Sequence, residues 1–315
     1  MSPRRYGDLS ILDSAKIRPD IQGLRGLAVL AVVAYHAQLP LSGGFVGVDM
    51  FFVISGWVVT NTVIRQVSGN SFSIISFYSK RIKRLVPMLT LVNLATLVLI
   101  VIFLSPFGEI QKALSTVRWS TFFSANIELL RADTYSNLIG NPFRHLWSLA
   151  VEEQFYLFYP VLVFVVTAIN AQLFHIQFEK ALRGVIAVIL LISFAYCLLL
   201  SSSGIGSASI RLAFFSMPSR MWEFACGIIL ATYGKSVCRI NSAFSSIVGV
   251  IGILLLLWSF TSINSLTIFP GWATIAPVVG TIFLLLSGDT SFMVKSLLSI
   301  KPLTYLGDIS YGWYL

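Results

Sequence analysis

The chain has 315 residues, of which 56% are hydrophobic and only 11% are charged, and its formal net charge is +9. This composition is too apolar for a soluble domain of this length and predicts a protein that crosses a membrane several times. The positive charge does not indicate a nucleic-acid partner, because the Lys and Arg residues are scattered between apolar runs, as is typical of loops beside an anionic membrane surface.

Apolar runs suited to membrane helices follow one another from residue 24 onward, with short loops between them. A helix needs about 20 apolar residues to cross the bilayer. The expected spans are 24–39, 45–64, 85–104, 146–169, 184–200, 211–233, 244–260 and 268–286, with a last one starting near Leu303. Segment 113–130 is only half apolar, and we expect it to cross, to re-enter or to lie on the surface. The sequence therefore predicts an all-α polytopic membrane protein, a bundle of about nine to ten transmembrane helices.

The distribution of Lys and Arg predicts a cytoplasmic N-terminus. If segment 113–130 does not cross, every basic cluster in the loops falls on the same side as Arg4 and Arg5, so the charge count favours nine crossings. The first apolar run has no small-residue cleavage site after it and is expected to be a retained helix. We divide the chain into a cytoplasmic segment, 1–23, and one transmembrane domain, 24–315.

The cysteines show no spacing typical of a metal site or of a disulfide framework. Cys197, Cys226 and Cys238 are the only ones in the chain, and two of them lie in apolar runs. We expect packing residues, no disulfide and no metal.

His36 lies in the first apolar run, where an ionisable side chain is costly and usually faces a polar interior. Arg25 comes eleven residues earlier, which places both side chains on nearly the same helix face, about 16.5 Å apart along the axis. A turn at Pro40 and the following glycines leads to Asp49, at a similar distance from that turn. A carboxylate beside an imidazole raises its basicity, so a general base is one interpretation. The other is a histidine hydrogen-bonded between helices, with Asp49 exposed at the turn.

Two further stretches place carboxylates and an arginine inside predicted spans. Glu152 and Glu153 are adjacent, so they point about 100° apart, and either a polar interior or a structural ion pair would explain them. Arg220 and Glu223 have the i,i+3 spacing of a helical ion pair, and spacing alone favours their pairing with each other.

Arg81 and Arg84 share one helix face just before the third span. Basic residues gather at any cytoplasmic helix end, which is one explanation. The alternative is an anion site, because guanidinium groups bind phosphates with two parallel hydrogen bonds.

Six stretches occur in the order in which a large family of bacterial membrane acyltransferases carries similar ones. They are RPDIQGLRGLAVLAVVAYHA, GGFVGVDMFFVISGWVVT, FYSKRIKRLVP, HLWSLAVEEQFYLFYP, MPSRMWEFACG and LGDISYGWYL. The chain resembles the acyltransferase-3 family from about Arg18 to Leu315, and the second and fourth stretches are most similar to its O-antigen and peptidoglycan acetylating branch. Six ordered motifs are a stronger signal than any one of them.

The resemblance implies a membrane O-acyltransferase that moves an acyl group, usually acetyl, from cytoplasmic acetyl-CoA to hydroxyls of a cell-envelope carbohydrate. The acceptor it implies is O-antigen, which is part of lipopolysaccharide, or another polysaccharide. It implies that Arg25 and His36 correspond to the family's essential first-helix pair. The other matching motif positions are Asp49, Arg81, Arg84, Glu152, Arg220 and Glu223.

From these matches we expect Arg81 and Arg84 to bind the phosphates of acetyl-CoA, with Arg25 on the path of its pantetheine arm. His36, oriented by Asp49 or Glu152, would accept the proton of the attacking hydroxyl or carry the acetyl group. Arg220 would stabilise the oxyanion or position the acceptor.

The family's last helix continues beyond the point where this chain stops, and a C-terminal SGNH-type domain often follows it. We therefore expect a truncated last helix, with an SGNH-type domain or protein as a candidate partner. A transporter or flippase of a lipid-linked or small polar substrate would also carry intramembrane charges. An inactive truncated remnant is the third interpretation.

Overall fold

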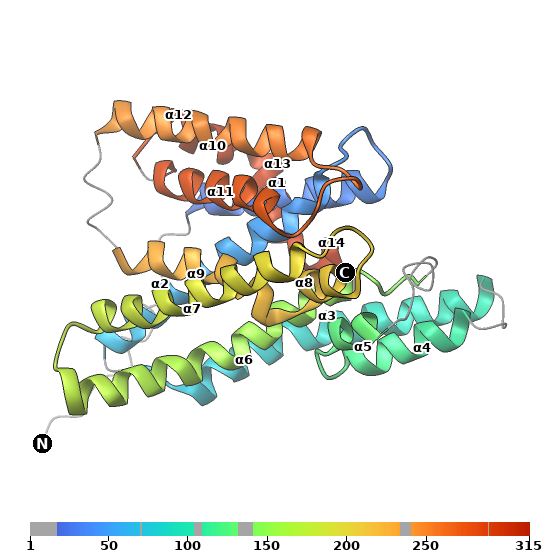
Figure 1. Cartoon of the computed structure of the whole chain (residues 1–315), viewed down its shortest axis with the longest axis horizontal. Coiled ribbons are helices and arrows are strands. Elements are labelled where there is room, and N and C mark those ends of the chain that lie inside the picture. Colours follow the sequence, from blue (N-terminus) through green and yellow to red (C-terminus); the bar gives the residue numbers. More distant parts are fainter. Residues whose placement is uncertain (1–17, 70, 104–108, 132–140, 234–240, 289) are drawn as a thin grey trace, which may run out of the picture.

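The computed structural model describes residues 18–69, 71–103, 109–131, 141–233, 241–288 and 290–315, and helices are the regular elements found there (Figure 1). The all-α prediction is confirmed for these residues. The helices are α1 (Pro19–His36), α2 (Gly47–Ser68), α3 (Ile74–Phe103), α4 (Glu109–Ser120), α5 (Ala125–Arg131), α6 (Leu146–Ile169), α7 (Phe178–Ser201), α8 (Ala208–Phe215), α9 (Met217–Tyr233), α10 (Ser242–Ser262), α11 (Ile275–Ser287), α12 (Phe292–Leu298), α13 (Lys301–Asp308) and α14 (Ser310–Tyr314).

Five of the described helical segments are long and apolar enough to cross a membrane, or six if the bent pair formed by α11 and α12 makes one span. The prediction of nine to ten crossings is therefore confirmed only in its coarser form, a multi-helix membrane bundle. The expected span 211–233 is broken at Ser216, so that α8 and α9 are separate helices. The 17 residues of α9 extend for about 25 Å, less than the hydrocarbon thickness of about 30 Å.

Segment 113–130 forms parts of two short helices joined by a turn. The 12 residues of α4 and the 7 residues of α5 pack against each other, and Thr116 donates a hydrogen bond to Glu128 across the pair at 3.0 Å. Figure 1 shows both helices at one end of the molecule, away from α10 and α11. This segment does not cross the membrane as a single helix.

The contact between α2 and α9 is among the closest in the bundle. A Cβ on Gly56 would lie 2.2 Å from the carbonyl oxygen of Phe224, and one on Gly227 would lie 2.1 Å from that of Val53. Small residues at these positions let the two backbones approach closely, as is typical of helix pairs in membranes. Each glycine follows a charged residue, Asp49 in α2 and Arg220 in α9, by two helical turns, so this approach also sets how those two side chains meet.

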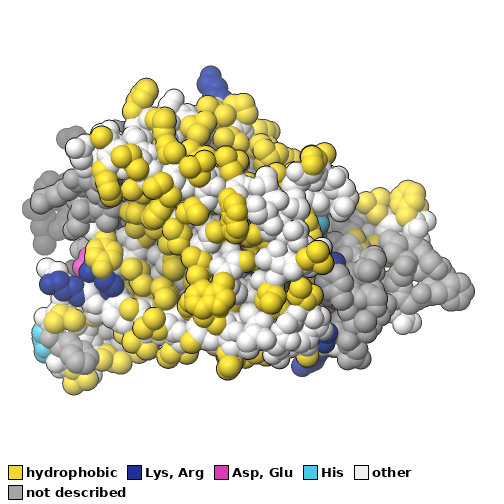
Figure 2. All heavy atoms as spheres, turned by 45° about the horizontal axis from the view of Figure 1, so that its top comes forward, with side chains coloured by type: hydrophobic (Ala, Val, Ile, Leu, Met, Phe, Trp, Pro, Cys, Tyr) yellow, Lys and Arg dark blue, Asp and Glu magenta, His cyan; other side chains and the backbone are white. Residues whose placement is uncertain are grey.

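Hydrophobic side chains cover much of the described surface in Figure 2, and the visible Lys and Arg side chains lie towards its edges. On α3 the exposed side chains include Leu91, Leu94, Val98 and Val101. An apolar exposed surface of this extent is unfavourable in water and matches a lipid environment. The surface therefore supports a membrane-spanning bundle.

The predicted orientation can be tested by cysteine labelling in a variant whose three native cysteines are replaced by serine. Ser79→Cys lies in α3 among the basic residues of one membrane face, and Ser203→Cys follows α7 at its other end. A membrane-impermeant maleimide added to intact cells should label position 203 and spare position 79, because basic loops stay in the cytoplasm. Labelling at position 79 from outside would reverse the orientation.

Candidate functional site

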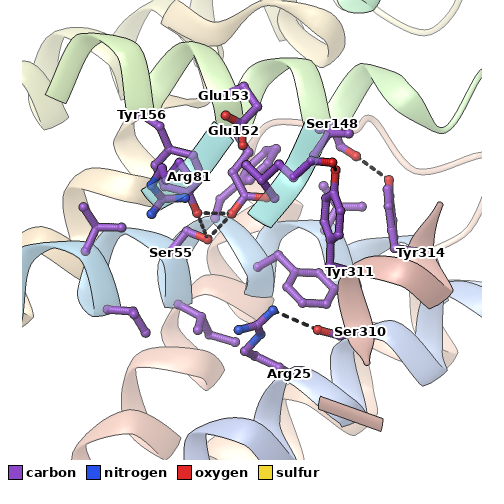
Figure 3. Close-up of a pocket in the computed structure, with 18 of the residues that line it drawn as sticks. Arg25, Ser55, Arg81, Ser148, Glu152, Glu153, Tyr156, Ser310, Tyr311 and Tyr314 are labelled. Carbon is purple, nitrogen blue, oxygen red and sulfur yellow. Dashed lines mark hydrogen bonds between the residues drawn. The ribbon is translucent and has the colours of Figure 1, made fainter. Parts of the chain in front are cut away.

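A cavity of about 100 Å³ lies between α1, α2, α3, α6 and α14 (Figure 3). Its lining combines three arginines, two glutamates and several hydroxyl groups. The polar residues that line it are Arg25, Ser55, Arg81, Arg84, Ser148, Glu152, Glu153, Tyr156, Ser310, Tyr311 and Tyr314. Arg25, Arg81, Arg84 and Glu152, which the sequence motifs single out as site residues, are therefore brought together in one place.

The two adjacent glutamates of α6 both reach this cavity. Glu152 Oε1 accepts hydrogen bonds from the hydroxyls of Tyr156, one turn later on α6, and of Ser55 on α2. These two hydroxyl oxygens lie 2.9 Å apart. Glu153 Oε1 is buried with no hydrogen-bond partner among the described residues. Neither glutamate belongs to an ion pair within that part of the chain, so the alternative of a structural ion pair is not supported there.

The three arginines of the cavity come from two helices. The guanidinium carbon of Arg81 lies 3.1 Å from the centroid of the Tyr156 ring, a cation–π contact. Arg84 follows one turn later on α3 and is exposed, while Arg25 on α1 donates a hydrogen bond to Ser310 Oγ at 2.9 Å. None of the three lies within ion-pair distance of a described carboxylate, although Glu152 and Glu153 line the same cavity, so the guanidinium groups remain available to bind an anion.

Arg220 lies in a second polar cluster that does not line the cavity. Its Nη2 is 2.5 Å from Asp49 Oδ1, its Nε is 3.0 Å from Glu223 Oε1, and all three side chains are at most 1% exposed. The predicted pairing of Arg220 with Glu223 is confirmed, and Asp49 is a third member that spacing along one helix does not reveal. The cluster ties α2 to α9.

The structure contradicts the expected contact between His36 and a carboxylate. Asp49 faces Arg220 across the α2–α9 contact, and Glu152 is held by the hydroxyls of Tyr156 and Ser55. His36 is the last residue of α1, exposed, with its ring edge against Tyr35, and it does not line the cavity. Equal distances from the turn place His36 and Asp49 at a similar depth in an antiparallel hairpin. The rotation of α2 about its own axis, however, turns Asp49 away from α1.

The sequence interpretation missed most of the hydroxyl groups of the cavity. The i,i+4 spacing of Glu152 and Tyr156 was available as a signal, because it puts both side chains on one helix face. No local pattern connects α6 with Ser55 or with Tyr314, whose hydroxyl bonds to that of Ser148. Those contacts depend on helices that meet only in the folded bundle.

The cysteines that the structure describes are free. Cys197 is buried in the hydrophobic core and Cys226 packs against that core from a partly buried position, as expected for packing residues. Cys238 lies outside the described residues. No group of three or more His, Cys, Asp or Glu side chains among the described residues is arranged to hold a metal ion.

Comparison with known proteins identifies relatives over nearly the whole chain. A family model described as an acyltransferase domain matches residues 18–315. Curated relatives include a peptidoglycan O-acetyltransferase, OatA, of Listeria monocytogenes, which is 31% identical over 96% of this chain and 49% of its own length. The O-acetyltransferase OatA of Staphylococcus aureus is 27% identical over 100% of this chain and 52% of its own.

A third relative, a putative peptidoglycan O-acetyltransferase of Bacillus subtilis, is 30% identical over 94% of this chain and 47% of its own length. The chain spans about half the length of the curated relatives it matches. No solved structure matches.

The charge balance of the Asp49–Arg220–Glu223 cluster predicts an order of stability among its variants. Arg220→Met strands two buried carboxylates and should destabilise the fold by about 3–5 kcal/mol, as expected when one partner of a buried pair is removed. Asp49→Asn leaves Arg220 paired with Glu223 and should lower the free energy of unfolding by less. Thermal unfolding in detergent measures the order, and an Asp49→Asn midpoint at or below that of Arg220→Met would contradict this account.

Proposed function

We propose, from the premise that the chain belongs to the acyltransferase-3 family, that it is a membrane O-acyltransferase that moves an acetyl group from acetyl-CoA to a hydroxyl of a cell-envelope carbohydrate. The observation that carries this proposal is the cavity of Arg25, Arg81 and Arg84, where three cations lie without an ion-pair partner among the described carboxylates. Unpaired charge inside a membrane bundle is costly and usually marks a functional site.

Arg81 and Arg84 are the candidates for binding the phosphates of acetyl-CoA. They lie one turn apart on α3, so both guanidinium groups can face one anion, and each can donate two parallel hydrogen bonds to a phosphate. The contact of Arg81 with the Tyr156 ring holds its planar group against the cavity wall. Arg25, on the opposite wall, would lie along the path of the pantetheine arm (Figure 3).

The chemistry requires that a cytoplasmic thioester and an external hydroxyl meet within one protein. A polar passage through the bundle satisfies this, because polar groups are tolerated at membrane depth where they line a cavity. Glu152, Ser55, Tyr156, Ser148 and Tyr314 supply hydroxyl and carboxylate groups on that route. His36 lies at the end of α1 and would accept the proton of the acceptor hydroxyl or take the acetyl group before passing it on.

For Asp49, Arg220 and Glu223 we propose a positioning role. All three are buried and paired with each other, outside the cavity, so the oxyanion role expected for Arg220 finds no support in its surroundings. They hold α2 against α9 and thereby fix the position of Ser55.

The names of two relatives point to peptidoglycan as the acceptor to test first, ahead of O-antigen. Peptidoglycan lies outside the cytoplasmic membrane, so the proposal places this chain in that membrane, with its donor face in the cytoplasm. An SGNH-type domain or protein is the candidate partner for the last transfer step.

The donor site is tested by replacing Arg81 and Arg84 together with Gln. Loss of both guanidinium groups should raise the KM for acetyl-CoA by about tenfold or more, because a charge-assisted hydrogen bond contributes about 1.5–3 kcal/mol. Membrane insertion should be unchanged, since other basic loops remain. Transfer from radiolabelled acetyl-CoA in membranes measures this.

Lys83→Gln is the matched control, because Lys83 lies between the two arginines, is exposed and does not line the cavity. Its KM should match that of the native protein. An unchanged KM in the double variant, or an equal rise in the Lys83→Gln variant, would argue against phosphate binding by these arginines.

A further inference from the structure

Two of the hydroxyl groups that line the cavity also contact the backbone of His145. The hydroxyls of Ser148 and Tyr314 are hydrogen-bonded to each other, and both line the cavity (Figure 3). Both hydroxyl oxygens also lie within hydrogen-bond distance of the carbonyl oxygen of His145, Ser148 at 3.2 Å and Tyr314 at 3.1 Å, so the two hydroxyl protons are shared among these three contacts. The His145 ring meets the Tyr314 ring edge to face, with centroids 5.9 Å apart. His145 is thus fixed against the cavity wall by α6 and α14 together.

The ring of His145 carries its proton on a defined nitrogen. Nδ1 lies 3.0 Å from the carbonyl oxygen of Pro142, and a carbonyl only accepts hydrogen bonds, so Nδ1 is the donor. Nε2 therefore presents a lone pair. That nitrogen is buried and accepts no hydrogen bond within the part of the chain that the structure describes, while the backbone of Leu315 lies beside the same ring. Burial lowers the pKa of His145 to about 4, so the ring is neutral at physiological pH.

His145 also lies near the other histidine of the proposed site. His36 contributes to the lowered pKa of His145, so the two side chains lie within electrostatic range of each other. His175, the third histidine, follows α6 at its far end. Two of the three histidines of the chain therefore lie at the same end of the bundle, although they are far apart in the sequence.

We propose that His145 is a second functional imidazole, whose Nε2 binds the acceptor hydroxyl and takes its proton. This inference rests on the proposed function. In the transfer, the bond from the hydroxyl oxygen to the acetyl carbon forms, and the bond from that carbon to sulfur, or to the ring nitrogen of His36 if it carries the acetyl group, breaks. The hydroxyl proton moves to His145 Nε2 and then to the leaving group or to water. A lone pair held in place by the Nδ1 hydrogen bond meets the geometric requirement for a general base, while the pKa of about 4 makes His145 a weaker base than an ordinary histidine.

A purely structural role of His145 would need only the Nδ1 side of its ring. If His145 served to begin α6, the hydrogen bond from Nδ1 to Pro142 would be sufficient, and Nε2 would be dispensable. Asparagine separates the two roles, because its side-chain amide can donate from near the Nδ1 position and has no atom at the Nε2 position.

The test compares His145→Asn with the native protein in membranes that contain a carbohydrate acceptor. Acetylation of the acceptor should fall by at least the ~10²-fold typical of general-base removal, while the KM for acetyl-CoA and the thermal unfolding midpoint stay at native values. His36→Ala should lose transfer as well. His175→Asn is the matched control and should keep native transfer. In His145→Ala, added imidazole should restore part of the activity.

The outcomes separate this inference from the proposed function. Near-native transfer by His145→Asn would show that the residue only begins α6 and would overturn the inference alone. A native protein that transfers no acetyl group from acetyl-CoA would overturn the proposed function, and this inference with it.

Discussion

The buried contact of Arg220 with Asp49 determines how α2 lies against α9, and the cavity depends on that placement. The two charges are at most 1% exposed, so their attraction is little screened, and leaving either one alone would be costly. Close backbone approach at Gly56 and Gly227 completes the contact two turns further on. With α2 held in this register, Ser55 faces Glu152 on α6, and the polar wall of the cavity forms.

The arginines that the motifs single out fall into two groups, which differ in their surroundings. Arg220 has carboxylate partners on both sides and is sealed in the protein, whereas Arg25, Arg81 and Arg84 face a cavity and have no such partner among the described residues. Glu152 and Glu153 line the same cavity, but neither lies within ion-pair distance of these arginines, so their guanidinium groups remain available to bind an anion. The phosphates of the proposed acyl-CoA donor would supply such an anion.

Local spacing in the sequence predicted the contacts made within one helix. The i,i+3 pair of Arg220 and Glu223 and the shared face of Arg81 and Arg84 are properties of α9 and α3 alone. Contacts between helices were not predictable in this way: equal distances from a turn suggested that His36 and Asp49 meet, but the rotation of α2 sends Asp49 to Arg220. The contact of Tyr314 with Ser148 and with the carbonyl of His145 likewise depends on α14 returning to α6, which no single stretch encodes.

The central claim is that acetyl enters from the face that carries Lys80 and Lys83 and leaves at the end of α1, where His36 lies. Sealed vesicles of known protein orientation, with a carbohydrate acceptor enclosed and radiolabelled acetyl-CoA outside, test it most directly. The account predicts labelled acceptor only where the Lys80 face is outside. Labelling that needs donor and acceptor on the same side of the membrane, or that occurs equally in both orientations, would contradict it.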